Sequence, residues 1–126
     1  MFPTSDEKMS WVTEVLIICS PEEYENSEER WFSRIPGHPE AGKDPVPIQE
    51  INQWLEDRDF SPLTRLDHHI ESEKMFDPLL FADALNFLPI DEFMSFIKKR
   101  NWSAPKQLMI LIQDQEESEF TIHKIS

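Results

Sequence analysis

Hydrophobic residues along this chain occur in short runs, and most of the runs predict β-strands. The first extends from Trp11 to Cys19 and ends at Ser20-Pro21, a pattern typical of a central strand. The periodicity of a second run, from about Leu79 to Asn86, fits either a buried strand or a helix, and we interpret it as a strand. Shorter strands are predicted near Leu63 to Leu66 and in segments 107–113 and 119–125, the last two as a hairpin.

Two other segments repeat their hydrophobic residues at the three- and four-residue spacing of a helix face. The first helix is predicted from about Pro47 to Arg58, with the proline in its first turn. The second begins after Pro89 and ends with the basic run Lys98-Lys99-Arg100, which complements the helix dipole. The apolar stripes contain Ile48, Ile51, Trp54 and Leu55 in the first helix, and Ile90, Phe93, Met94 and Ile97 in the second.

The order strand, helix, strand, strand, helix, strand, strand predicts an α+β fold. It matches a split βαβ, or ferredoxin-like, arrangement in which two helices cover one face of a mainly antiparallel sheet and a C-terminal hairpin adds a strand. We expect residues 1–126 to form a single domain, with residues 1–9 mobile and residues 35–47 forming a proline-rich surface loop. Residues 21–31 are too charged for a core, so we expect a loop or a solvated helical turn there.

Acidic residues outnumber basic residues by a wide margin. The 126 residues include 25 Asp and Glu against 12 Lys and Arg, which leaves a net charge of −13. Such a surface repels nucleic acid and attracts basic proteins. Because the helix dipole already explains the run Lys98-Lys99-Arg100, direct nucleic-acid binding is the function that we disfavour most.

The sequence also predicts where the protein acts. No stretch reaches the roughly 20 apolar residues of a membrane span, and the first ten residues are too polar and acidic for a signal peptide. The single cysteine, Cys19, has no partner for an internal disulfide, and we interpret it as a core thiol rather than a nucleophile. We therefore expect a cytoplasmic protein without membrane contact.

Asp67-His68-His69 is the segment whose residue types best suit metal binding or acid–base chemistry. Adjacent side chains on an extended chain point to opposite faces, so we expect at most one of the two histidines to join Asp67. The chain also has no glycine-flanked serine and only two glycines for a phosphate-binding loop. We expect a solvated loop here, no metal site, no cofactor and no catalytic residue.

Two acidic clusters are candidate partner-binding surfaces. Aromatic rings beside carboxylates offer apolar contact area and bidentate acceptors to a Lys- and Arg-rich partner. The alternative is that both clusters are solvated turns that serve solubility and protect sheet edges. Trp31 and Trp102 lie in loop-like segments, where each serves either as an interface anchor or as a lid over the core. The first cluster contains Glu22, Glu23, Tyr24, Glu25, Glu28, Glu29 and Trp31, and the second, at the predicted hairpin turn, contains Asp114, Glu116, Glu117 and Glu119.

The C-terminal part of the chain carries a series of short motifs: Asn86-Phe87-Leu88, Asp91-Glu92-Phe93, Trp102 with Pro105, Gln107-Leu108, and Gln113 to Glu117 before Phe120. These motifs resemble a loose group of uncharacterised small bacterial proteins over roughly the last 45 residues. The resemblance implies a fold and a bacterial, cytoplasmic setting, but no reaction. In size, acidity and lack of catalytic residues, the whole chain also resembles bacterial toxin-immunity proteins, which implies a basic, nuclease-type toxin as partner.

These observations lead to three functional hypotheses. The first is a small acidic binding protein that inhibits a basic protein partner, as the immunity protein of a bacterial toxin does. The second is a structural or regulatory module that associates with itself through its sheet. The third, which we favour least, is an enzyme that uses His68 or His69 with Asp67, with or without a metal.

Overall fold

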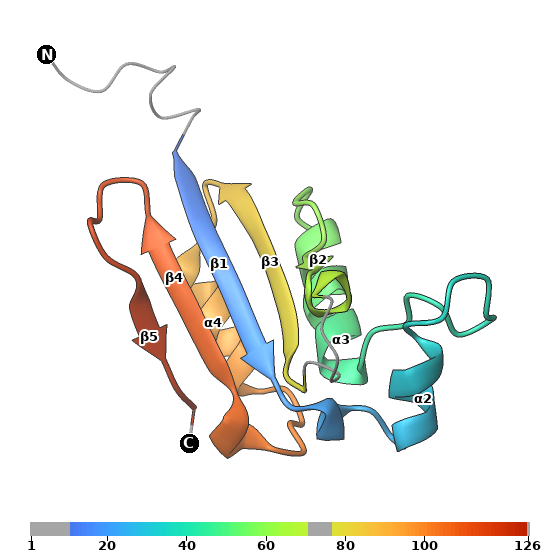
Figure 1. The fold of residues 1–126 in the computed structure, drawn as a ribbon. Helices are drawn as coiled ribbons and strands as arrows, with labels where there is room; N and C mark the ends of the chain where they lie inside the picture. Colours follow the sequence, from blue (N-terminus) through green and yellow to red (C-terminus); the bar gives the residue numbers. More distant parts are fainter. Residues whose placement is uncertain (1–10, 71–76, 126) are drawn as a thin grey trace, which may run out of the picture.

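A five-stranded antiparallel sheet lies at the centre of the fold, with the strand order β2-β3-β1-β4-β5 (Figure 1). The computed structural model describes residues 11–70 and 77–125, so the expectation that residues 1–9 are mobile lies outside the described residues. The strands are β1 (Val12–Cys19), β2 (Thr64–Arg65), β3 (Leu79–Asn86), β4 (Met109–Asp114) and β5 (Thr121–His123).

β1 is the central strand because its alternate residues are buried and both of its edges are paired. Ile17 lies opposite Phe81 of β3 and Ile110 of β4, and all three side chains have an exposure of 0%. The run from Leu79 to Asn86 is a strand as predicted, since it pairs with β1 along its whole length.

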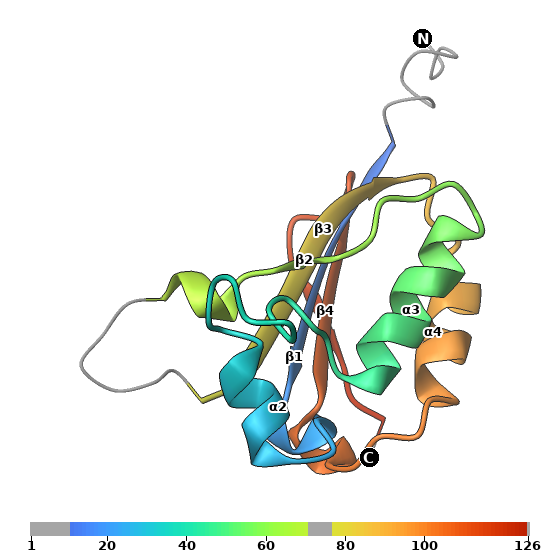
Figure 2. The same cartoon turned by 90° about the vertical axis from the view of Figure 1, so that its right-hand side faces the viewer.

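Helices α3 (Val46–Glu56) and α4 (Ile90–Lys98) lie on the same side of the sheet (Figure 2). The ring of Trp54 on α3 contacts Phe93 and Phe96 on α4, with centroid distances of 5.6 and 5.8 Å. The two predicted helices therefore form and pack together, and the predicted α+β class with an antiparallel sheet is confirmed.

The segment between β1 and α3 contains more regular structure than the sequence predicts. It forms the 3₁₀ turn η1 (Pro21–Glu23) and the short helix α2 (Ser27–Phe32), which lie beyond the C-terminal end of β1 (Figure 1). The proline-rich loop that follows is held against α2, because the ring of Phe32 stacks on His38 at 4.2 Å and Gly42 donates its N–H to the carbonyl of Ser33 at 2.9 Å.

Two further 3₁₀ turns complete the fold: η2 (Asp67–His69) follows β2, and η3 (Pro105–Gln107) precedes β4. Trp102, between α4 and η3, is buried and donates its indole N–H to the carbonyl of Ile97 at 2.8 Å. It is thus a lid over the core rather than an exposed anchor. Across residues 11–70 and 77–125, no helix combines the length and the apolar character that crossing a membrane requires.

Candidate functional site

Two short helical segments form as soon as β1 ends, and they carry the first acidic cluster. Ser20 begins η1, since its hydroxyl accepts the N–H of Glu22 at 3.1 Å, and Pro21 occupies the first turn. Asn26 begins α2 in the same way, with its side-chain oxygen accepting the N–H of Glu29 at 2.9 Å. These caps position the acidic side chains at the end of the sheet.

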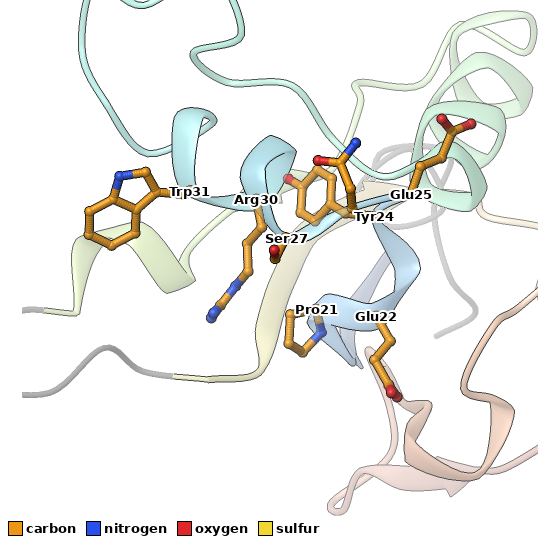
Figure 3. Close-up of a pocket in the computed structure, with 8 residues that line it drawn as sticks. Pro21, Glu22, Tyr24, Glu25, Ser27, Arg30 and Trp31 are labelled. Atoms are coloured by element: carbon orange, nitrogen blue, oxygen red, sulfur yellow. The ribbon is translucent and has the colours of Figure 1, made fainter.

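A surface cavity between η1 and α2 is the candidate site, and we name it the η1–α2 hollow (Figure 3). Its volume is about 560 Å³. Trp31, which is 55% exposed, lies at one end and Glu25 at the other, with the ring of Tyr24 between them. The residues that line it are Pro21, Glu22, Tyr24, Glu25, Asn26, Ser27, Arg30 and Trp31. An aromatic surface flanked by carboxylates can contact the stem of a Lys or Arg side chain and bind its cationic head.

Glu23 corrects the sequence interpretation of the first cluster. It is only 5% exposed, and its carboxylate accepts the backbone N–H groups of Ser103 at 2.8 Å and Ala104 at 2.9 Å. These bonds fasten η1 to the segment that precedes β4. Glu23 is therefore a structural anchor, and its carboxylate is not presented to a partner.

Tyr24 is also buried, at 5% exposure, and its ring lies at the hollow (Figure 3). Its hydroxyl donates to the carbonyl of Lys43 and accepts a hydrogen bond from Arg65 Nη1 at 2.8 Å. Burial raises the pKa of Tyr24, so the hydroxyl remains protonated and keeps its role as a donor. The ring is a fixed wall of the hollow because the hydroxyl is held from behind.

A buried ion pair between Arg65 and Asp67 supports this wall. The guanidinium Nε lies 3.1 Å from Asp67 Oδ1 and Nη2 lies 3.2 Å from Oδ2, while Nη1 donates to Ser33 Oγ at 2.9 Å. Asp67 also accepts the N–H of Leu80 at 3.1 Å. The pair joins β2, β3, the end of α2 and, through Tyr24, the wall of the hollow.

Arg30 lines the η1–α2 hollow, and the sequence interpretation did not single it out. Its Nη2 donates to the carbonyl of Asp77 at 2.7 Å, and its Nη1 lies 3.5 Å from the Asp77 carboxylate. The guanidinium therefore joins α2 to Asp77, two residues before β3, and the Asp77 carboxylate offsets its charge. A lone arginine in a run of glutamates has no periodic signal, and only the tertiary position of Asp77 reveals this role.

The remaining members of the first cluster differ in accessibility. Glu22, Glu25 and Glu28 are exposed, but Glu28 does not line the hollow. Glu29 is half-buried and lies 3.3 Å from Lys43 Nζ. The carboxylates that border the hollow are thus those of Glu22 and Glu25.

The second acidic cluster lies at the opposite end of β1, where Asp114 pairs with Thr13 (Figure 1). Asp114 accepts the Trp11 indole N–H at 3.1 Å and the Thr13 hydroxyl. Glu117 accepts the N–H of Asp114 at 3.0 Å and stabilises the hairpin turn, whereas the Asp114 carboxylate joins β4 to Trp11 and Thr13. Glu116 and Glu119 are exposed. The structure does not bring the two predicted clusters together.

Asp67, His68 and His69 do not converge on one site. Asp67 is fully buried in its ion pair, whereas the two histidines are exposed and their rings lie 4.1 Å apart. The expectation that they point to opposite faces is wrong, because η2 replaces an extended chain. Among residues 11–70 and 77–125, no three His, Cys, Asp or Glu side chains are grouped closely enough to hold a metal ion.

Cys19 is buried at the end of β1, with an exposure of 1%. Burial raises the pKa of its thiol strongly, and the charges of Glu23 and Asp67 raise it further. The thiolate is the nucleophilic form of cysteine, so this environment disfavours covalent chemistry at Cys19.

Comparison with known proteins identifies no matching family model, no matching curated protein and no matching solved structure.

Proposed function

We propose that this chain is an acidic binding protein that associates with a basic protein and inhibits it, and that the η1–α2 hollow is the centre of its contact surface. The proposal is based on one observation, which is that aromatic and acidic side chains line the same hollow. The Tyr24 ring and the exposed Trp31 supply apolar contact, and Glu22 and Glu25 supply negative charge beside it. Trp and Tyr are enriched among the hot spots of protein interfaces, and carboxylates bind guanidinium groups with charge-assisted hydrogen bonds.

The net charge of −13 supports the same partner class. Long-range attraction between oppositely charged proteins increases their association rate, and salt screens it over a Debye length of about 10 Å at 0.1 M. Tight binding then depends on the hollow, where aromatic groups are removed from water. We therefore expect the overall charge to raise the association rate and the contacts in the hollow to determine the affinity.

An arginine-rich peptide tests the hollow directly. We expect the double substitution Glu22→Gln with Glu25→Gln to weaken peptide binding by about tenfold, or about 1.4 kcal/mol, in isothermal titration calorimetry. The matched control, Glu28→Gln with Glu116→Gln, removes two exposed carboxylates outside the hollow and is expected to change affinity by less than about twofold. Equal effects of the two pairs would show that net charge alone binds the peptide.

The resemblance to toxin-immunity proteins supports a nuclease-type toxin as the partner, and the proposal includes a cytoplasmic location. We expect the neighbouring reading frame to encode a secreted protein that ends in a basic nuclease-like domain. Purified chain should inhibit the nuclease activity of that domain at equimolar concentration, with an association rate that falls as salt rises. An association rate that is independent of ionic strength would contradict the role of charge.

A ferredoxin-like split βαβ arrangement, with β5 as an additional strand, is the finer architecture that we propose. The strand order supports it, because β3 lies between β1 and β2, the strands that α3 connects. In the same way, β1 lies between β3 and β4, which α4 connects. The acidic segment η1–α2 is then an insertion between the first strand and its helix.

A further inference from the structure

The face of β1, β3, β4 and β5 opposite α3 and α4 is not covered by any helix of the described residues, because α2 and η2, which lie toward that side in Figure 2, are beyond the end and the edge of these strands (Figure 1). Side chains alternate along a strand, so the residues between the buried positions of β1, β3 and β4 point to this face. Most of them are apolar and only partly buried. We call this surface the open sheet face and define it by Leu16, Ile18, Leu80, Met109, Leu111 and Ile122.

The strand register gathers these side chains into two adjacent rows. Leu16 lies opposite Leu111, which lies opposite Ile122 on β5. Ile18 lies between Leu80 and Met109. Ile122 is 56% exposed, so the apolar surface continues to the edge of the sheet.

The open sheet face carries little of the charge of this protein. Charged residues make up 29% of the chain, yet Glu14 is the single charged residue among the described strand positions that point to this face. The solvent-facing side of an antiparallel sheet usually carries polar residues at alternate positions. A contiguous apolar surface on an otherwise highly charged protein is typical of an interface.

We infer that the open sheet face is the contact surface between two copies of this chain, packed sheet against sheet. The strands present a single carboxylate, that of Glu14, on this face. Charge complementarity therefore does not favour a basic protein as the partner at this surface. A second copy presents a surface that is equally apolar and nearly neutral. Two such faces can pack about 10 Å apart, as in β-sandwiches. The strands of each copy would place a single charged side chain, that of Glu14, in this interface.

The size of the face determines the strength of the dimer. With about 3.4 Å along each strand residue and about 4.8 Å between strands, the five strands present a footprint of roughly 440 Å² per copy. Two copies together lie below the roughly 1,200 Å² of standard specific interfaces. The dimer is therefore expected to be weak and to dissociate on dilution.

Salt distinguishes this inference from the proposed function. Two copies that each carry a charge of −13 repel one another at long range. Salt screens this repulsion, so added salt is expected to strengthen the dimer. Added salt is expected to weaken the association with a basic partner, because it screens the attraction between opposite charges. The two surfaces also use different elements, since η1 and α2, which line the hollow, lie beyond the C-terminal end of β1 (Figure 1).

Sedimentation velocity at protein concentrations from about 5 to about 500 µM tests the dimer. We expect a reversible monomer–dimer equilibrium that shifts toward dimer in added NaCl. Ile122→Lys places a charge on the open sheet face and is expected to raise the dimer dissociation constant at least about tenfold. Val46→Lys is the matched control, because Val46 is similarly exposed, at 48%, but lies on α3.

A monomer at every concentration and salt level would overturn the inference, as would equal effects of Ile122→Lys and Val46→Lys. Circular dichroism of both variants verifies that they fold. The substitution Glu22→Gln with Glu25→Gln lowers the repulsion between copies and is not expected to weaken the dimer, and loss of the dimer in that variant would also overturn the inference. A monomeric chain that still binds the arginine-rich peptide would contradict the sheet interface while leaving the hollow intact.

Discussion

Replacing Arg65 with methionine is expected to lower the free energy of unfolding by about 3–5 kcal/mol, the cost typical of leaving one charge of a buried pair without its partner. The Arg65 and Asp67 side chains are 7% and 0% exposed. Methionine removes all the guanidinium contacts with the Asp67 carboxylate and the hydrogen bonds to Tyr24 and Ser33. Urea denaturation followed by circular dichroism measures the loss.

Arg58→Met is the matched control for this prediction. Arg58 is exposed on α3's C-terminal side and its guanidinium lies 3.9 Å from the ring centroid of Trp54. Its removal is expected to cost no more than about 1 kcal/mol. Adding Asp67→Asn to Arg65→Met should recover part of the stability, because no isolated carboxylate then remains buried. A loss for Arg65→Met as small as that for Arg58→Met would contradict the structural role of the pair.

Replacing Trp31 with alanine is expected to weaken binding of an arginine-rich peptide by about 30-fold, or about 2 kcal/mol, as at other aromatic hot spots. Trp31 is 55% exposed and lines the η1–α2 hollow. Because its ring packs little against the core, the free energy of unfolding is expected to change by no more than about 0.5 kcal/mol. Titration calorimetry and urea denaturation measure the two effects separately.

Phe120→Ala serves as the comparison for Trp31. Phe120 is an aromatic residue with 43% exposure, and it follows the second acidic cluster directly. If the contact surface is the hollow, this substitution leaves peptide binding unchanged. Loss of binding with Phe120→Ala and not with Trp31→Ala would place the contact at the hairpin and would contradict the proposal.

The elements with the strongest patterns were those that the sequence predicted best. β1 and α4 each have a long apolar run or stripe with clear ends, and both form at the predicted positions. The segment that forms β3 was ambiguous, because the hydrophobic pattern of so short an apolar run fits a strand and a helix equally well. In the structure it is a strand, since it pairs with β1 along its whole length. For residues 21–31 the sequence left a loop and a solvated helical turn as alternatives, because the six residues of α2 are too few and too charged for a periodic signal.

Contacts between residues that are far apart in the sequence limited how much of the candidate site could be predicted. Glu22, Glu25 and Trp31 were proposed as contact residues, and they do line one hollow. Glu23 belongs to the same acidic run, but its acceptors are occupied by N–H groups 80 and 81 residues further along the chain. No local pattern distinguishes it from its neighbours. Asp67 was considered with the histidines that follow it, whereas its actual partner is the preceding Arg65.

The amino-acid sequence by itself determined the charge of −13 and the class of most elements, because charge and short-range periodicity are local properties. Only the tertiary structure decided which carboxylates face solvent and which are anchors. A buried carboxylate requires hydrogen-bond donors, and the fold supplies them from distant segments. The apolar open sheet face likewise follows from strand order and from both helices packing on the other side, which no single segment of the chain encodes.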